Sequence, residues 1–273
     1  MEFARPQTLT QALGLLSEGG RVLAGGTDLY PGSGSKLSGQ MVDVTGLADL
    51  SGIRAADGLR IGAATSWSAI AEADLPPALC ALKQAARQVG GRQVQNAGTI
   101  GGNLCNASPA ADGVPPLLAL EAGVELVSTR GTRTLPLADF LLGPRKTALQ
   151  PGEILAAVLI PASALAGRSA FLKLGARSHL VISIAMVAAR IEVEAGRIRR
   201  AALAVGACSP VAVRLPAVEA ALGGVPVAEA GARIQPEDVA VMLSPLDDVR
   251  ATAAYRREAA VELVRRAVTE ALG

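Results

Sequence analysis

Two short glycine-rich segments constrain the fold of this chain more than any other feature of its 273 residues. The longer segment runs from Asn96 to Asp112 and reads N-A-G-T-I-G-G-N-L-C-N-A-S-P-A-A-D, with three glycines and three asparagines. Glycine and asparagine gain little from packing and favour turns, so this segment is a poor helix and a poor strand. We therefore expect a binding loop here.

The shorter segment, Ala24-Gly25-Gly26-Thr27-Asp28, follows a predicted strand at 21–24. Backbone amides can hold a diphosphate only where no side chain stands between the chain and the phosphate, and consecutive glycines meet this requirement. Neither segment contains the G-x-G-x-x-G string of a Rossmann helix or the G-x-x-x-x-G-K-[ST] string of a P-loop. Each glycine pair alone is explained more readily as a structural turn, but together with the tail at 106–112 the two pairs favour ligand binding.

The composition excludes several classes of function. Every apolar run is broken by a charge, a glycine or a proline before it reaches the length of a membrane span, although the mean hydropathy is +0.37. The net charge of +2 is dispersed and only 2% of residues are aromatic, which argues against nucleic-acid binding. The N-terminus has no pattern of an export signal, so we expect a cytoplasmic protein.

Metal sites and catalytic triads are difficult to build from this sequence. Cys80, Cys105 and Cys208 are far apart and form no C-x-x-C pair, which fits neither a zinc site nor an iron–sulfur cluster. His179 is the single histidine, so it cannot build a His-based metal site. Redox or group-transfer chemistry therefore has to come from an organic cofactor.

Apolar periodicity predicts alternating helices and strands over the first 165 residues. Thr8 and Gln11 have the spacing of a capping box, and Asp112 can cap a helix that starts at Pro115 and Pro116. The remaining elements of this half are expected as helices at 9–16, from Ser66 and at 77–89, and as strands at 21–24, 41–44, 59–63, 124–127 and 154–160.

The pattern changes after a connector at 161–168. A short strand at 171–174 is followed by an alternating strand at 184–194, a turn at 195–196 and a strand at 198–205, which is typical of an antiparallel hairpin. A helix from about 248 to 272 ends the chain. The sequence therefore predicts an α+β fold that closes with an antiparallel sheet and helices.

Four strings carry a resemblance to a known family: A-G-G-T-D-L, T-I-G-G-N-L-C-N-A-S-P-A-A-D, P-G-E-I-L and F-L-K-L-G-A-R. They closely resemble the FAD-binding subunit of the molybdenum hydroxylases, a family that includes the flavoprotein subunits of carbon monoxide dehydrogenase and bacterial xanthine dehydrogenase. The resemblance implies a two-part FAD-binding domain of the vanillyl-alcohol-oxidase-like type at 1–165, with two α/β subdomains that meet near residue 55. A C-terminal domain like that of the CO dehydrogenase flavoprotein would follow at 166–273.

The resemblance also implies a binding site. Both glycine segments would wrap the diphosphate of FAD, with glycine amides and the hydroxyls of Thr27 and Thr99 as donors. Asp112 would accept from ribityl or ribose hydroxyls unless it is a plain helix cap, and the backbone of Leu155 would meet the isoalloxazine edge unless this is an ordinary core leucine. Lys173 would place a cation near the carbonyl end of the ring unless it faces solvent. The implied cofactor-binding residues are Ala24, Gly25, Gly26, Thr27, Asp28, Thr99, Ile100, Gly101, Gly102, Asn103, Asn106, Asp112, Leu155 and Lys173.

Three further residues have open roles. Tyr30 and Trp67 could each cover part of a flavin, although packing is the more expected role of both. His179 is expected in packing or at the surface and not as a covalent attachment point for the flavin.

By the same resemblance, the chain would be the electron-transfer subunit of a heterotrimer. A large molybdopterin-binding subunit would oxidise the substrate, a small subunit with [2Fe–2S] clusters would relay single electrons, and FAD would pass them to NAD+, a quinone or dioxygen. One alternative is a stand-alone FAD oxidase or reductase of the vanillyl-alcohol-oxidase-like group, for which two tyrosines and one histidine are a poor catalytic set. Another is a flavin-free assembly or scaffold protein, which would have lost the glycine pairs.

Overall fold

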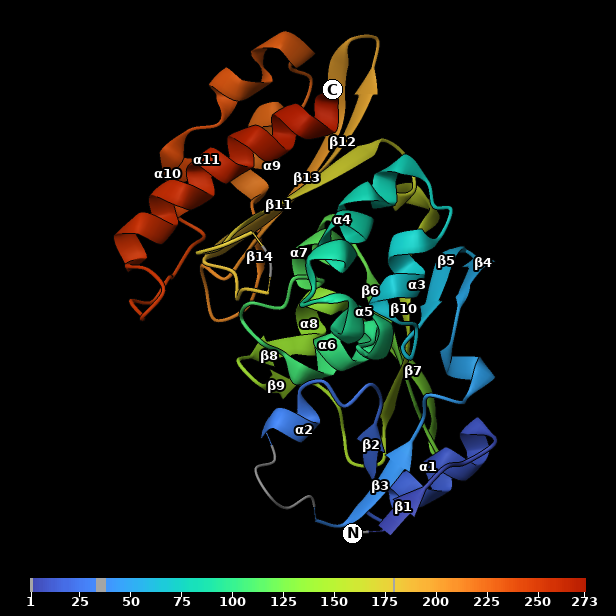
Figure 1. The fold of residues 1–273 in the computed structure, drawn as a ribbon. Helices are drawn as coiled ribbons and strands as arrows, with labels where there is room; N and C mark the ends of the chain where they lie inside the picture. The colour runs from blue at the N-terminus through green and yellow to red at the C-terminus, as the bar shows by residue number, and fades with distance from the viewer. Residues whose placement is uncertain (1, 33–37, 179) are drawn as a thin grey trace.

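The computed structural model describes residues 2–32, 38–178 and 180–273. Its architecture is α+β, as the sequence predicts. Three sheets follow one another from the N-terminus to the C-terminus, and a layer of helices separates the second sheet from the third (Figure 1). No helix in the described ranges is both long enough and apolar enough to cross a membrane.

The first sheet is parallel, and its three strands lie in the order β1 (Glu2–Ala4), β3 (Gln40–Asp43) and β2 (Arg21–Leu23). The helix α1 (Leu9–Ser17) packs Leu13 beside Val42 of the central strand. Thr8 caps this helix by accepting a hydrogen bond from the amide of Gln11, which confirms the predicted start. Because β2 is an edge strand, the turn that follows it leaves the sheet freely and leads into α2 (Leu29–Gly32).

The second sheet is antiparallel, and its five strands lie in the order β4 (Ile53–Ala56), β5 (Gly58–Gly62), β10 (Ile154–Ile160), β6 (Gly123–Ser128) and β7 (Gly131–Pro136). The central strand β10 is buried along almost its whole length. Two 3-10 turns flank the sheet in sequence, η1 (Ala48–Leu50) and η3 (Ala162–Ala164). The helical layer packs on this sheet.

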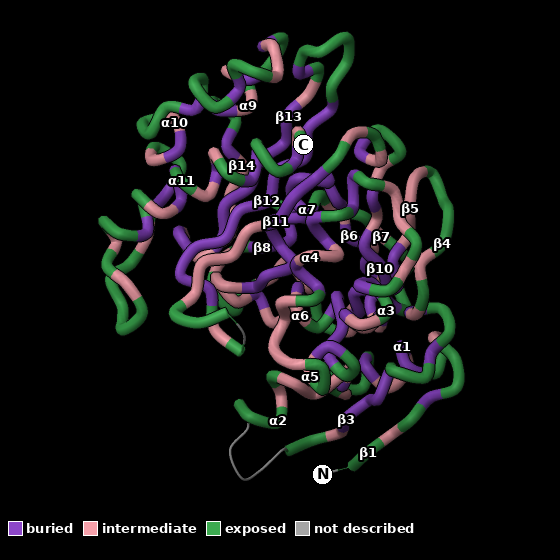
Figure 2. Tube along the Cα trace, turned by 45° about the horizontal axis from the view of Figure 1, so that its top comes forward, coloured by how far each residue is buried: buried purple, intermediate pink, exposed green. Residues whose placement is uncertain are grey.

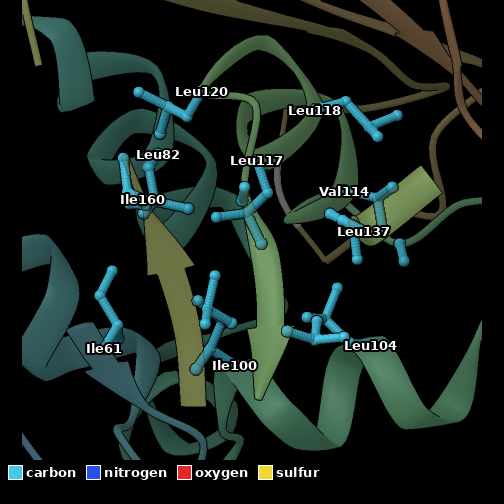
Figure 3. Packing of buried hydrophobic residues seen from close by; sticks show 14 of the residues in the cluster. Ile61, Leu82, Ile100, Leu104, Val114, Leu117, Leu118, Leu120, Leu137 and Ile160 are labelled. Carbon is cyan, nitrogen blue, oxygen red and sulfur yellow. The ribbon is translucent and has the colours of Figure 1, made fainter. Parts of the chain in front are cut away.

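The helical layer consists of α3 (Trp67–Glu72), η2 (Pro77–Leu79), α4 (Cys80–Gln88), α5 (Arg92–Ala97), α6 (Ile100–Asn106), α7 (Val114–Ala119) and α8 (Leu137–Phe140). Its core is mostly aliphatic but also contains Trp67 and Phe140. Ile100 and Leu104 of α6 belong to this core together with Leu117 of α7 and Ile160 of β10 (Figure 3). A small hairpin of β8 (Leu141–Gly143) and β9 (Lys146–Thr147) borders α6.

The third sheet is antiparallel, with strands in the order β11 (Arg168–Leu174), β12 (Ala185–Glu194), β13 (Arg197–Gly206) and β14 (Val213–Arg214). The elements that follow it are α9 (Pro216–Leu222), η4 (Val227–Arg233), α10 (Pro236–Ala240) and α11 (Ala253–Leu272). The predicted hairpin at 184–205 is confirmed. Both faces of β12 are buried, one under α9 and α11 and the other against α4 and α7 (Figure 2).

The expectation of a loop throughout 96–112 is wrong for residues 96–97, which end α5, and for residues 100–106, which form α6. The hydroxyl of Thr99 accepts a hydrogen bond from the amide of Gly102 and caps the helix. Ile100 and Leu104 lie one turn apart and are both fully buried. Their burial outweighs the low helix propensity of Gly101 and Gly102.

The terminal helix begins later than expected, at Ala253 and not near Asp248. The carboxylate of Asp248 accepts hydrogen bonds from the amides of Arg250 and Ala251 and so forms a turn that competes with helix. Thr252 then caps α11 by accepting a hydrogen bond from the amide of Tyr255.

A buried ion pair ties the third sheet to the helical layer. Arg190 of β12 is inaccessible to solvent, and its Nη1 lies 2.6 Å from Oε1 of Glu192. The same guanidinium donates from Nε to the carbonyl oxygen of Ala119, at the end of α7, over 3.0 Å. A buried arginine that loses its carboxylate leaves an uncompensated charge, so this contact is costly to break.

We expect Glu192→Ala to lower the free energy of unfolding by about 3 kcal/mol, because the buried Arg190 then keeps only the more distant carboxylate of Glu121, 4.0 Å from its Nη2 atom. Urea denaturation measures this loss. Glu194→Ala is the matched control on the same strand, since that side chain is 71% exposed, and it should cost less than about 0.5 kcal/mol. Equal losses in the two variants would show that the buried pair does not hold the layers together.

Candidate cofactor-binding site

The two glycine segments meet in space. A Cβ added to Gly25 would lie 1.8 Å from the carbonyl oxygen of Ala97 and 2.9 Å from the amide nitrogen of Gly98. A Cβ on Gly98 would in turn lie 3.4 Å from the hydroxyl of Thr27. The turn after β2 therefore packs backbone against backbone on the junction of α5 and α6, and only glycine fits at position 25.

A cavity of about 850 Å³ opens beside this contact, within the range of roughly 300–1,000 Å³ that is usual for ligand pockets. Every predicted site residue lines it except Ile100 and Lys173. Ile100 is fully buried in the core of the helical layer (Figure 3). Predicted site residues from three separate parts of the sequence, 24–28, 99–112 and 155, therefore line the same cavity.

The first glycine turn offers its main-chain amides to this cavity. Within the described residues, the N–H groups from Gly25 to Leu29 have no acceptor in the protein. Gly26 has a φ of +69°, a left-handed conformation that favours glycine. Successive amides in such a turn form a concave nest that binds anions.

The amides of residues 100–103 in the second glycine segment are already bonded within the protein, contrary to the expectation that both segments offer their glycine amides to a ligand. The amide of Ile100 donates to the carbonyl oxygen of Thr65 over 3.1 Å, and that of Gly101 donates to Ala63 over 2.8 Å. The amides of Gly102 and Asn103 are bonded within α6 to the hydroxyl and the carbonyl oxygen of its cap. Contacts with residues 63–65 and with the helix cap have used these donors.

The two glycines of this segment have different tasks. A Cβ on Gly101 would lie 2.6 Å from the Ala63 Cβ and 2.7 Å from its carbonyl oxygen, so this glycine permits close packing of α6 on the end of β5. A Cβ on Gly102 would meet only the hydroxyl of Thr99, at 3.0 Å, and Gly102 lines the cavity. Gly102 therefore keeps the cavity open, while the buried, unpartnered Oδ1 of Asn103 is an acceptor in its wall.

Asp112 and Lys173 form a buried pair at another wall of the cavity. The Nζ atom of Lys173 lies 2.6 Å from Oδ2 of Asp112, and the two side chains are 6% and 10% exposed. The hydroxyl of Ser183 donates to Oδ1 over 2.7 Å. Burial raises the pKa of Asp112, while Lys173 and Ser183 oppose that rise.

This arrangement corrects two expectations. Asp112 does not cap α7, because its side chain is bonded to Lys173 and Ser183 and the cap residue is Gly113. Lys173 neither faces solvent nor lines the cavity. The carboxylate of Asp112 stands between the ammonium group and the cavity, so a ligand meets an acceptor there and not a free cation.

Leu155 lies where β10 is irregular. The pairing of β10 with β6 shifts between Leu155 and Ala157, and the pairing with β5 begins only at Ala157 and Gly62. The backbone of Leu155 is therefore not paired with β5, although its side chain is buried in the core. At this position the side chain of Leu155 can pack in the core while its backbone contacts a ligand in the cavity.

Trp67 and Tyr30 occupy different positions relative to the cavity. Trp67 is buried, lines the cavity and donates its main-chain amide to the carbonyl oxygen of Gly98 over 3.1 Å. The ring of Tyr30 covers Gly26, where a Cβ would lie 2.3 Å from it, and the residue is half exposed. His179 lies outside the described residues.

Several lining residues were not predicted as site residues, and apart from Glu153 in the string P-G-E-I-L they carried only an apolar or loop pattern. They are Val89 and Val94 near α5, Val181 and Ile182 before β12, Glu153 and Arg145. Glu153 is held by Arg133, with Nε and Oε1 separated by 2.7 Å, and this contact lowers the pKa of Glu153. The proline beside Arg145 indicated only a turn.

We expect Lys173→Met to destabilise the protein by about 3 kcal/mol near neutral pH, because it leaves the Asp112 carboxylate buried without its cation. Without Lys173 the pKa of Asp112 rises further, so protonation relieves the penalty as the pH falls. Urea denaturation between about pH 5 and about pH 8 should show a loss that grows with pH. Lys146→Met is the exposed control, and a pH-independent loss at position 173 would contradict the pairing.

Comparisons with known proteins agree with these features. A family model described as the FAD binding domain in molybdopterin dehydrogenase matches residues 1–163, and the CO dehydrogenase flavoprotein C-terminal domain matches residues 170–271. The xanthine dehydrogenase FAD-binding subunit of Escherichia coli O157:H7 is 31% identical over 281 aligned positions, covering 99% of this chain and 95% of that protein. The nicotine 6-hydroxylase medium subunit of Paenarthrobacter nicotinovorans is 31% identical over 280 positions, covering 99% and 97%.

A solved structure shows the same likeness in three dimensions. A chain of the reconstituted CO dehydrogenase from Oligotropha carboxidovorans matches with a TM-score of 0.89 and 28% identity, covering 100% of this chain and 97% of that one. The sequence and structural matches both extend over the whole chain. The chain therefore belongs to the FAD-binding subunits of the molybdenum hydroxylase family, a family of oxidoreductases whose flavin cofactor is FAD.

Proposed function

We propose that this chain carries FAD in the cavity between its two glycine segments and transfers electrons within a molybdenum hydroxylase complex. The observation that carries the proposal is the run of unpartnered amides from Gly25 to Leu29, which faces a cavity that Gly102 keeps open. A diphosphate satisfies such amides, and a side chain at Gly102 would project into the space that it needs.

The predicted site residues have distinct tasks in this proposal. The amides of the first turn hold the diphosphate, and the hydroxyl of Thr99 stays free to donate because it only accepts from Gly102. Asp112 and the Oδ1 of Asn103 accept from hydroxyl or imide donors of the cofactor. Lys173 acts through Asp112 by opposing the effect of burial on its pKa and by holding the side chain in place.

Bound FAD supplies the ability to accept electrons singly and to release them in pairs. The protein contributes orientation and exclusion of water, through Trp67 and the aliphatic residues Val89, Val181 and Leu155 of the cavity wall. The proposed electron donor is a small partner subunit with [2Fe–2S] clusters, and a large molybdopterin-binding subunit completes a cytoplasmic heterotrimer. NAD+, a quinone or dioxygen would accept the electrons.

The relatives support a substrate site outside this chain. The proteins it matches along almost their whole length are named for xanthine, nicotine and CO, which are a purine, a pyridine derivative and a diatomic gas. A subunit that enzymes with such different substrates share is expected to carry a step that does not depend on the substrate, which here is electron transfer through FAD. A stand-alone oxidase and a flavin-free scaffold are the competing functions, and each makes a different experimental prediction.

We expect Gly102→Val to weaken FAD binding at least about a hundredfold with little change in stability, because its side chain would project into the cavity. Titration of the FAD-free protein, followed by quenching of Trp67, the single tryptophan, measures the affinity. Gly14→Val, in α1 with open space around it, is the matched control.

Gly101→Val should behave differently and lower the free energy of unfolding, because its side chain would collide with the backbone of Ala63.

FAD retention by Gly102→Val at wild-type affinity would contradict the proposed site. Absence of FAD binding in the wild-type protein would favour the scaffold.

The FAD-loaded chain alone should not be reduced by xanthine, an aldehyde or an aromatic carboxylate, although dithionite should reduce it. Anaerobic absorbance spectra of the flavin provide the measurement. Turnover of any of these substrates by the single chain would support the stand-alone oxidase and contradict the electron-transfer role.

A further inference from the structure

Arg145 occupies an unusual backbone position at the cavity. It lies in the tight turn between β8 and β9 and has a φ of +59°, a conformation that non-glycine residues rarely adopt. Its amide donates to the carbonyl oxygen of Ala107 over 2.8 Å, and Ala107 is itself left-handed with a φ of +45° at the end of α6. Backbone strain of this kind is concentrated at ligand-binding sites.

One side of the Arg145 guanidinium is fixed to the protein. Its Nη1 atom donates to the main-chain oxygen of Asn106 over 3.2 Å and to the Oδ1 atom of the same residue. Nε and Nη2 have no acceptor among the residues that the structure describes. These two nitrogens form the edge of a guanidinium that binds a phosphate or carboxylate through two parallel hydrogen bonds.

The other charges of the cavity wall make Arg145 distinctive. Asp112 is paired with Lys173, and Glu153 is paired with Arg133. Arg21 also lines the cavity, but no contact within the described ranges holds its side chain. Of the two arginines that line the cavity, Arg145 is therefore the one whose side chain is held by hydrogen bonds to described residues.

We infer that Arg145 binds a phosphate group in the cavity, at the C-terminal end of α6. The inference rests on the proposed FAD function, because the phosphate would belong either to FAD or to a pyridine-nucleotide electron acceptor. The length of α6 favours the acceptor. The first glycine turn meets the N-terminal end of α6, and Asn106 lies seven residues after Thr99, a rise of about 10 Å along the helix.

The test compares Arg145→Gln with Lys146→Gln. Lys146 is the next residue, carries the same charge and is exposed, but does not line the cavity. Two affinities are measured by calorimetry, that of inorganic pyrophosphate for the FAD-loaded protein and that of FAD for the FAD-free protein, with riboflavin as the phosphate-free reference.

We expect Arg145→Gln to weaken pyrophosphate binding about tenfold, the value of a charge-assisted hydrogen bond, while FAD affinity stays within about twofold. Lys146→Gln should change neither affinity. A tenfold loss of FAD affinity with riboflavin unchanged would assign the phosphate to FAD itself. Indistinguishable behaviour of the two variants in both measurements would overturn the inference.

Arg145→Lys separates geometry from charge. A lysine cannot hold Asn106 and also present two parallel donors, so this variant should bind pyrophosphate nearly as weakly as Arg145→Gln. Wild-type affinity in Arg145→Lys would overturn the two-donor geometry. If the wild-type protein binds no FAD, the proposed function fails, and the pyrophosphate comparison on the FAD-free protein still decides the role of Arg145.

Discussion

The close approach of Gly25 to the Ala97 carbonyl is the contact on which the site depends. No Cβ can be accommodated there, since it would lie 1.8 Å from that oxygen. This contact joins the small parallel sheet to the junction of α5 and α6, and it places the free amides of the first turn beside Gly102. The cavity lies beside this backbone contact, and residues from both glycine segments line it.

The two glycine pairs look alike in sequence but do different physical work. The first pair leaves its amides without partners in the described part of the chain, whereas the amide of Gly101 donates to the carbonyl oxygen of Ala63 and that of Gly102 donates to the hydroxyl of Thr99. Gly101 allows a helix to sit on a strand end, and Gly102 keeps side chains out of the cavity. The two buried carboxylates at the cavity, Asp112 and Glu153, are each paired with a cation of the protein, Lys173 and Arg133 respectively.

Much of the fold could be predicted from local pattern. The periodicity at 9–16 and the alternation at 184–205 identify α1 and the β12–β13 hairpin, because each element buries residues at its own repeat. The helix at 100–106 could not be predicted, since its stability comes from the burial of Ile100 and Leu104 against distant strands. The role of Asp112 was hidden for the same reason, because Lys173 and Ser183 are distant in sequence. Whether the chain divides at 165 into two domains stays a prediction.

A crystal structure of the FAD-bound protein tests the central claim most directly. The account predicts diphosphate oxygens at about 3 Å from main-chain nitrogens of residues 25–29, with the amides of 100–103 still bonded to the protein. A diphosphate held by the amides of 100–103, or FAD bound outside this cavity, would contradict it.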